Sequence, residues 1–390
     1  MNPWMQYLVW PLIKFLIAFV IVQGIVAAMN WIERRLLGLI QARLGPNRVG
    51  PKGLLQIVAD PIKFLLKEDI VPSSAEKIAY FLGPMLPLLP AFLVFCLIPY
   101  GPPPTFVPTD TNVGLLLILA LTSTGVYGII LGGWASNNKY SLMGGLRSAA
   151  QMVSYEVPFG LSIVGVLMIC GSFRLVKIIE YQEMHVWNLF PQLVGAFIFF
   201  VAMNAENNRT PFDLPEAESE LVAGYHTEYS AMKFAFFMLA EYSSMTVNCC
   251  LMVVLYLGGW TLSIGGWGIT TRALQDLGLL GGLIGAAIFI TKVMFFMLVY
   301  IWFRATFPRF RFDQLMDLGW KWMIPLALGN IVVTGIIVLA LGKVNGTYVG
   351  EIVLSIAGAI AIAFTLFLLG RGARPAQHAK VMHASRVYEA

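Results

Sequence analysis

The sequence predicts an all-α membrane protein, a polytopic transmembrane helical bundle of about nine spans. Of its 390 residues, 58% are hydrophobic and only 12% are charged, and the mean hydropathy is +0.75. A soluble domain is closer to half apolar and a quarter charged. Apolar stretches of ~20 residues, the length that crosses a bilayer, recur along the chain. We therefore expect one integral-membrane domain over residues 1–390.

Nine apolar segments account for the predicted spans. The fifth is short and merges into an acidic stretch, and the ninth begins at Glu351. The first is too long for a signal-peptide core and lacks a small-residue cleavage site, so we expect it to be retained. The predicted spans are about 8–32, 79–99, 113–135, 149–170, 189–205, 232–257, 281–303, 323–341 and 350–369.

The basic residues predict the orientation, because cytoplasmic loops are enriched in Lys and Arg. With the amino terminus outside, nineteen of the 26 basic residues fall on the cytoplasmic side and four outside. We expect a multi-pass protein of the bacterial inner membrane, with a cytoplasmic tail at 371–390. The net charge of +5 follows from this bias, and no basic patch interleaved with aromatic residues indicates nucleic-acid binding.

The cysteines and histidines predict no cofactor bound by this chain alone. Cys96, Cys170, Cys249 and Cys250 lie in or beside apolar segments and form no CxxC pair. The four histidines show no metal-ligand spacing, and no GxGxxG or GxxxxGK[ST] motif occurs. We expect no metal, haem or iron–sulfur site here.

The first cytoplasmic loop, 33–78, predicts an amphipathic helix after the turn residues at 45–53. One helical face is apolar, and Asp60 and Lys63 lie opposite or beside it. Pro61 should kink this helix or end its first half. Such a helix usually lies in the membrane interface and anchors a loop. The alternative is a lateral doorway for a hydrophobic ligand, with nearby arginines at its opening.

Three ionisable residues fall inside predicted spans, where charge is costly and indicates function. They are Glu156, Glu241 and Lys292. One interpretation is a structural ion pair between Glu241 and Lys292. The other is a proton relay, because buried carboxylates exchange protons near neutral pH.

Loop 206–230 contains the densest group of carboxylates, although it borders two spans. Asp213 and Glu216 have the spacing of a helix capping box. Capping does not explain the rest of the group, because like charges at i, i+4 oppose helix formation. Coupled carboxylates titrate as a set and could respond to charge arriving nearby. The group comprises Asp213, Glu216, Glu218, Glu220 and Glu228.

Four long stretches carry a family resemblance. They read "ERRLLGLIQARLGPNRVGPKGLLQIVADPIKFLLKE", "SYEVPFGL", "NRTPFDLPEAESELVAGYHTEYS" and "WFRATFPRFRFDQLMDLGWK". Together they resemble the H-subunit family of bacterial respiratory complex I, the proton-pumping NADH:quinone oxidoreductase. The resemblance runs from the first span to the eighth. Pro61 departs from the glycine usual at that position, which concerns the shape of the amphipathic helix.

The resemblance implies an enzyme subunit that shapes a quinone chamber and couples quinone reduction to proton translocation. Quinone is then the substrate, and FMN and iron–sulfur clusters lie on partner subunits. The implied partners are the peripheral quinone-site subunits, small membrane-arm subunits and the lipid bilayer. The implied chamber and tunnel residues are Arg34, Arg35, Arg43, Asp60, Lys63, Asp213, Glu216, Glu218, Glu220 and Glu228. The implied proton relay comprises Glu156, Glu241 and Lys292.

Two alternatives stay open from the sequence. One is the equivalent subunit of a membrane-bound hydrogenase or of a ferredoxin-dependent quinone reductase. The other is a secondary ion transporter, for which loops 33–78 and 206–230 are too elaborate.

Overall fold

All nine apolar segments form helices in the computed structural model, which describes residues 9–214, 221–340 and 350–361. Seven candidate spans are long and apolar enough to cross a membrane, and two apolar helices are shorter. The seven are α1 (Trp10–Ile40), α3 (Lys77–Val94), α4 with α5 (Gly114–Ser123 and Gly125–Ala135), α6 (Lys139–Cys170), α10 (Ala231–Tyr256), α12 (Gly278–Thr306), and α13 (Phe312–Asp317) continued through the π-helical segment η4 (Leu318–Met323) into α14 (Ile324–Ala340). The two shorter helices are α8 (Leu193–Glu206) and Gly350–Ala361. The predicted all-α polytopic class is confirmed.

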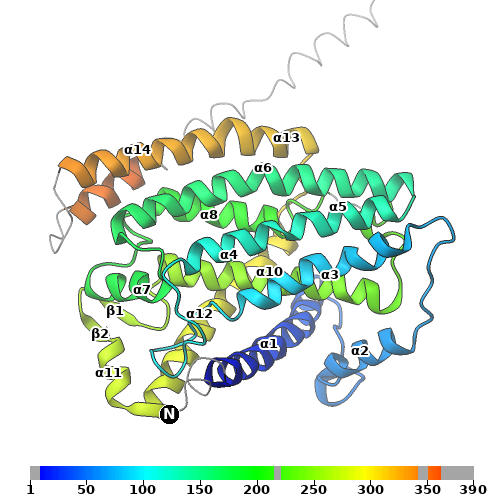
Figure 1. Ribbon diagram of the computed structural model, residues 1–390, viewed down its shortest axis with the longest axis horizontal. Coiled ribbons are helices and arrows are strands. Elements are labelled where there is room, and N and C mark those ends of the chain that lie inside the picture. The colour runs from blue at the N-terminus through cyan, green and yellow to red at the C-terminus, as the bar shows by residue number, and fades with distance from the viewer. Residues whose placement is uncertain (1–8, 215–220, 341–349, 362–390) are drawn as a thin grey trace, which may run out of the picture.

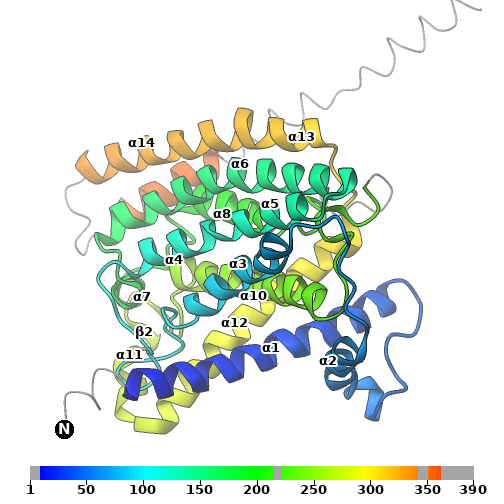
Figure 2. The same ribbon diagram turned by 45° about the vertical axis from the view of Figure 1, so that its right-hand side comes forward.

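The long helices run side by side in a bundle (Figure 1). Helices α13 and α14 form one face, and α1 with α12 the opposite one (Figure 2). Between them α3 packs on α5, α5 on α6, and α6 on α8, while α10 packs on α3. The ionisable residues of α10 therefore lie in the middle of the bundle.

Short elements gather at the two ends of the bundle (Figure 1). One end carries α7 (Leu175–Met184), the hairpin of β1 (Leu262–Ile264) and β2 (Trp267–Ile269), and α11 (Thr271–Asp276). The other end carries α2 (Gln56–Leu66), beside the short 3-10 turn η2 (Pro51–Gly53). A second 3-10 turn, η3 (Gly224–His226), precedes α10.

Small residues let α3 and α5 approach closely. A Cβ atom on Gly83 would lie 3.0 Å from the Cα of Gly132, and one on Gly128 would lie 2.7 Å from the carbonyl oxygen of Gly83. Helices in membranes associate through such contacts, because lipid supplies no hydrophobic drive between them. This packing fixes the wall against which α10 lies.

Helix α2 continues through Pro61, so the prediction that this proline ends the first half of the helix is wrong. Pro61 is the sixth residue of the helix and removes only one backbone hydrogen bond near its start. The predicted apolar face is exposed, as expected for a helix that meets lipid. Its exposed residues are Leu54, Leu55, Val58, Ile62, Leu65 and Leu66.

The hairpin of β1 and β2 was not predicted. Gly265 and Gly266, which join the two strands, have φ values of 62° and 78°. Two consecutive positive φ angles are typical of the tightest hairpin turns, and glycine adopts them without steric cost. Strands of three residues are too short to show the alternation that signals a strand in sequence.

Candidate functional site

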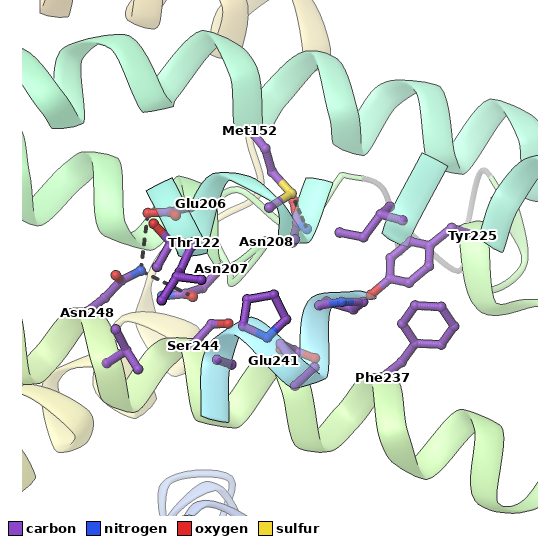
Figure 3. A pocket seen from close by; sticks show the side chains of 18 residues that line it. Thr122, Met152, Glu206, Asn207, Asn208, Tyr225, Phe237, Glu241, Ser244 and Asn248 are labelled. Carbon is purple, nitrogen blue, oxygen red and sulfur yellow. Dashed lines mark hydrogen bonds between the residues drawn. The ribbon is translucent and has the colours of Figure 1, made fainter. Parts of the chain in front are cut away.

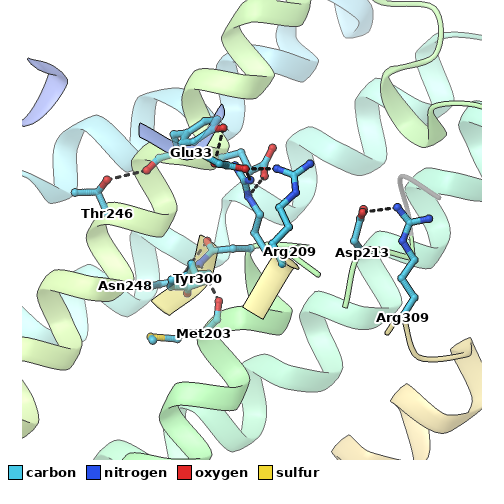
Figure 4. Close-up of polar contacts among 12 residues, drawn as sticks. Glu33, Met203, Arg209, Asp213, Thr246, Asn248, Tyr300 and Arg309 are labelled. Carbon is cyan, nitrogen blue, oxygen red and sulfur yellow. Dashed lines mark hydrogen bonds and ion pairs between the residues drawn. The ribbon is translucent and has the colours of Figure 1, made fainter. Parts of the chain in front are cut away.

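A buried cluster of four charges lies in the half of the bundle next to α2 (Figure 4). Arg209 pairs with Glu33 (Nη1 to Oε1, 3.0 Å) and with Glu241 (Nε to Oε1, 2.5 Å). Arg304 pairs with the same oxygen of Glu33. Glu33 is only 3% exposed and Arg209 8%. The two carboxylates and two guanidinium groups balance, which burial demands because an unpaired buried charge is costly.

Tyr242 completes this cluster. Its hydroxyl donates to the second carboxylate oxygen of Glu33 at 2.8 Å, and its ring lies 4.4 Å from the guanidinium carbon of Arg209. Burial alone would lower the pKa of Arg209, but the carboxylates of Glu241 and Glu33 raise it well above its ordinary value. Arg209 is therefore a fixed positive charge at the centre of the cluster.

Polar side chains of α6 hold Arg209 in place. The Nε2 atom of Gln151 donates to the carbonyl oxygens of Ala205 and Phe212, each at 2.8 Å. Asn208, which has a positive φ of 49°, donates to the hydroxyl of Ser148 at 3.0 Å. A buried backbone must find such partners. The chain after α8 is thus shaped by α6 before it reaches Arg209.

The cluster lines a polar cavity of about 340 Å³. Helices α1, α2, α10 and α12 and the segment after α8 all contribute to its wall. Beside it lies a mostly apolar cavity of about 220 Å³ between α1, α2 and α10. The two cavities share Arg34, Phe64 and Tyr242 among their lining residues. Together they lead from α2 at the surface to the buried charges.

Two of the five predicted opening residues lie at these cavities. Arg34 pairs with Asp60 at 2.8 Å, which joins α1 to α2, and both line the apolar cavity. Arg35, Arg43 and Lys63 line neither cavity. Their contacts are local: Arg35 donates to the carbonyl of Lys52, Arg43 to the side chain of Gln41, and the ammonium of Lys63 lies 5.0 Å from the ring of Phe64.

The predicted acidic group divides between separate places. Asp213 lines the polar cavity and pairs with Arg309 at 2.9 Å (Figure 4). Burial raises the pKa of Asp213 in spite of Arg309. Glu228 lies elsewhere and accepts from the amide of Asn138 at 2.6 Å. Glu216, Glu218 and Glu220 lie outside the described residues, as does part of the predicted capping box.

A second, smaller polar cavity of about 60 Å³ lies between Glu206 and Glu241 (Figure 3). It has room for a few water molecules, since one needs roughly 10–15 Å³ of such volume. The Nδ2 atom of Asn248 donates to Glu206 at 3.3 Å and to Asn207 at 3.4 Å. Glu156 accepts from Ser123 and interacts with Glu206 through their charges. Glu156, Glu206 and Glu241 therefore form a series that ends at Arg209.

Lys292 has a different environment, and the predicted ion pair between Glu241 and Lys292 is wrong. The ammonium donates to the carbonyls of Leu257 (2.6 Å), Gly259 (3.0 Å) and Thr261 (2.7 Å), just beyond the end of α10. A cation is favourable at a helix carboxyl terminus. Glu241 takes Arg209 as its partner instead.

Sequence reasoning missed several residues of the site. Glu33 and Arg304 lie near the ends of spans, where charged residues usually face water. Glu206 falls just past the fifth predicted span. A search for charges flanked by apolar residues on both sides finds only Glu156, Glu241 and Lys292. The signal that could have found Glu206 is the shortness of the fifth apolar segment, which brings its terminal acid deeper into the bundle.

Comparisons with known proteins identify the family. A sequence model of the NADH dehydrogenase family matches residues 13–335. A protein of Koribacter versatilis, the second of two H subunits named for NADH-quinone oxidoreductase there, is 46% identical over 353 residues, which is 85% of this chain and 98% of that protein. The first H subunit of Geobacter sulfurreducens is 46% identical (86% and 96% covered), and the H subunit of Brevibacillus brevis is 48% identical (84% and 93% covered). The chain therefore belongs to the NADH dehydrogenase family, as a membrane subunit of an NADH-quinone oxidoreductase.

Proposed function

We propose that the chain forms the membrane wall of the quinone-binding chamber and the tunnel that leads into it. The observation that carries this proposal is the pair of adjoining cavities at α2. The outer one is apolar and suits an isoprenoid tail, while the inner one presents Arg209, Asp213 and Arg304 to a polar headgroup. Ligand sites commonly combine an apolar pocket with a few convergent polar groups. The Arg34–Asp60 pair ties α2 to α1 at the opening.

Narrowing the apolar cavity tests this proposal. Ala235 lines the cavity, so Ala235→Trp should obstruct the passage of a long tail. We expect the KM for a long-tailed quinone to rise at least tenfold, the KM for a short-tailed analogue to rise much less, and NADH oxidation by ferricyanide to be unchanged. Ala120→Trp, at an exposed position of α4, is the matched control. Equal effects of Ala235→Trp on both quinones would contradict the proposed tunnel.

We also propose that the carboxylate series carries the coupling from the chamber into the membrane arm. Asp213 and Arg209 face the polar cavity, Glu241 lines both polar cavities, and Glu206 lies across the smaller one. Water in that cavity would complete a proton path between carboxylates. Lys292 is left out of this path because three carbonyls hold its ammonium beyond the end of α10.

The same proposal places the chain in its assembly. Loops 33–78 and 206–230 face the cytoplasm and the peripheral subunits, which hold FMN and the iron–sulfur clusters. The amino terminus lies outside the bacterial inner membrane, and small membrane-arm subunits are neighbours. The described parts of the two loops contact each other, since the backbone N–H of Ile70 donates to the hydroxyl of Ser230 at 3.0 Å. The names of the relatives favour NADH as the donor over hydrogen or ferredoxin.

A further inference from the structure

A third cavity of about 570 Å³ lies outside the site described above, between α8, α12, η4 and α14. It is larger than either quinone-side cavity, and its wall is almost wholly apolar. A cavity of roughly 150 Å³ already admits a benzene molecule. Most of the wall is aromatic, with Phe197, Phe200, Phe303, Phe307, Phe310 and Trp322.

The shortness of α8 explains why this space exists. Its 14 residues span ~21 Å, whereas the hydrocarbon core of a bilayer is ~30 Å thick. Beyond Glu206 the chain leaves the helix, and Pro211 and Phe212 of the following segment line the cavity. The solvent at this depth of a membrane protein is the lipid acyl chain, so an apolar cavity here is matched to hydrocarbon.

Charge at the same end of the cavity selects the headgroup. Lys321 is among the lining residues, and Arg309 and Arg311 flank Phe310. Residues 304–321 carry four basic side chains against two carboxylates, Asp313 and Asp317. Anionic lipids attract such residues by ~1 kcal/mol each near the surface. Trp322 is also typical of a helix at the level of the headgroups.

We propose that this cavity binds an acyl chain of an anionic phospholipid, with Lys321 beside the headgroup. The chain would pack behind Phe212, which is buried and whose ring lies 5.4 Å from that of Phe310 and 5.6 Å from that of Tyr155. Phe212 lies between Arg209 and Asp213 in the sequence. The bound lipid therefore supports the segment that positions both charges, a consequence that rests on the proposed chamber.

Photolabelling of the assembled enzyme tests the site. The probe is phosphatidylglycerol with a diazirine on one acyl chain, and adducts are mapped by mass spectrometry. We expect adducts on the lining residues of α8, α12 and α14. Val201→Trp, which fills the cavity, should reduce them at least tenfold, whereas Val332→Trp on the exposed face of α14 should not. Labelling that is insensitive to Val201→Trp overturns the proposal, as does the absence of adducts in the wild-type enzyme because a partner helix fills the space.

A second variant tests the headgroup and does not depend on the core substitution. Lys321→Gln should lower the preference for the phosphatidylglycerol probe over its phosphatidylcholine counterpart about fivefold, the equivalent of ~1 kcal/mol. Lys177→Gln, an exposed substitution on α7, is the control. An unchanged preference in Lys321→Gln refutes the anionic headgroup. Ala235→Trp should leave the labelling intact, so failure of the tunnel proposal and failure of this one are distinguishable.

Discussion

The strongest test of the buried cluster is a double-mutant cycle on Arg209 and Glu241. Arg209→Met leaves Glu33 and Glu241 with Arg304 as their remaining cationic partner, a net buried charge of −1. Removing one partner of a buried pair typically costs ~3–5 kcal/mol. Adding Glu241→Gln to Arg209→Met restores neutrality and should recover at least ~2 kcal/mol of that loss.

The assay is the half-life of the assembled complex on heating, followed by native gel electrophoresis, because large membrane assemblies unfold irreversibly. Since ~1.4 kcal/mol corresponds to a factor of ten, Arg209→Met should shorten the half-life by roughly 100-fold or more if the cluster breaks in the rate-limiting step. The double variant should lengthen it again at least about 20-fold. The readout is independent of catalysis, so a loss of activity in either variant does not obscure it.

The exposed pair between Arg174 and Asp110 is the matched control. The side chain of Arg174 is 37% exposed, and surface pairs contribute only ~0–1 kcal/mol. Arg174→Met should therefore change the half-life by about fivefold at most. A double variant no more stable than Arg209→Met alone would refute the reasoning that charge balance holds the cluster together.

Two further predictions concern the acid–base groups of the cytoplasmic end. Burial lowers the pKa of His226 from 6.5 to about 4. The unfolded segment thus binds a proton that the folded one excludes, and the segment should lose stability as the pH falls from about 6.5 to about 4, by up to ~3 kcal/mol. Amide exchange of residues 221–230 should accelerate over that range, and His226→Gln should remove most of the acceleration; the same pH dependence in the variant contradicts the assignment. Glu206→Gln keeps the size and the hydrogen bond of Asn248 but removes the exchangeable proton, so quinone-linked proton pumping should fall at least tenfold while ferricyanide reduction is unchanged. Glu180→Gln on α7 is its control, and normal pumping in Glu206→Gln would exclude that residue from the path.

The apolar lengths in the sequence determined the fold class, because spanning a bilayer is a local requirement. A segment of ~20 apolar residues meets it whatever its neighbours are. All nine predicted segments form helices, and the amphipathic helix at 56–66 formed where its pattern indicated. The sequence also identified Glu156 and Glu241, whose apolar flanks on both sides mark them as charges within spans. The long motifs identified the family for the same reason: they are contiguous in sequence.

Only the tertiary structure decided which charges meet. Glu33, Arg209, Glu241 and Arg304 come from three helices and one loop, and no spacing in the sequence relates them. Glu33 belongs to the same "ERR" run as Arg34, yet one is buried in the cluster and the other lies at the cavity opening. Lys292 shows the converse, since a charge within a span found three backbone carbonyls rather than the expected carboxylate. Burial makes pairing obligatory but does not name the partner; the packing of the helices does.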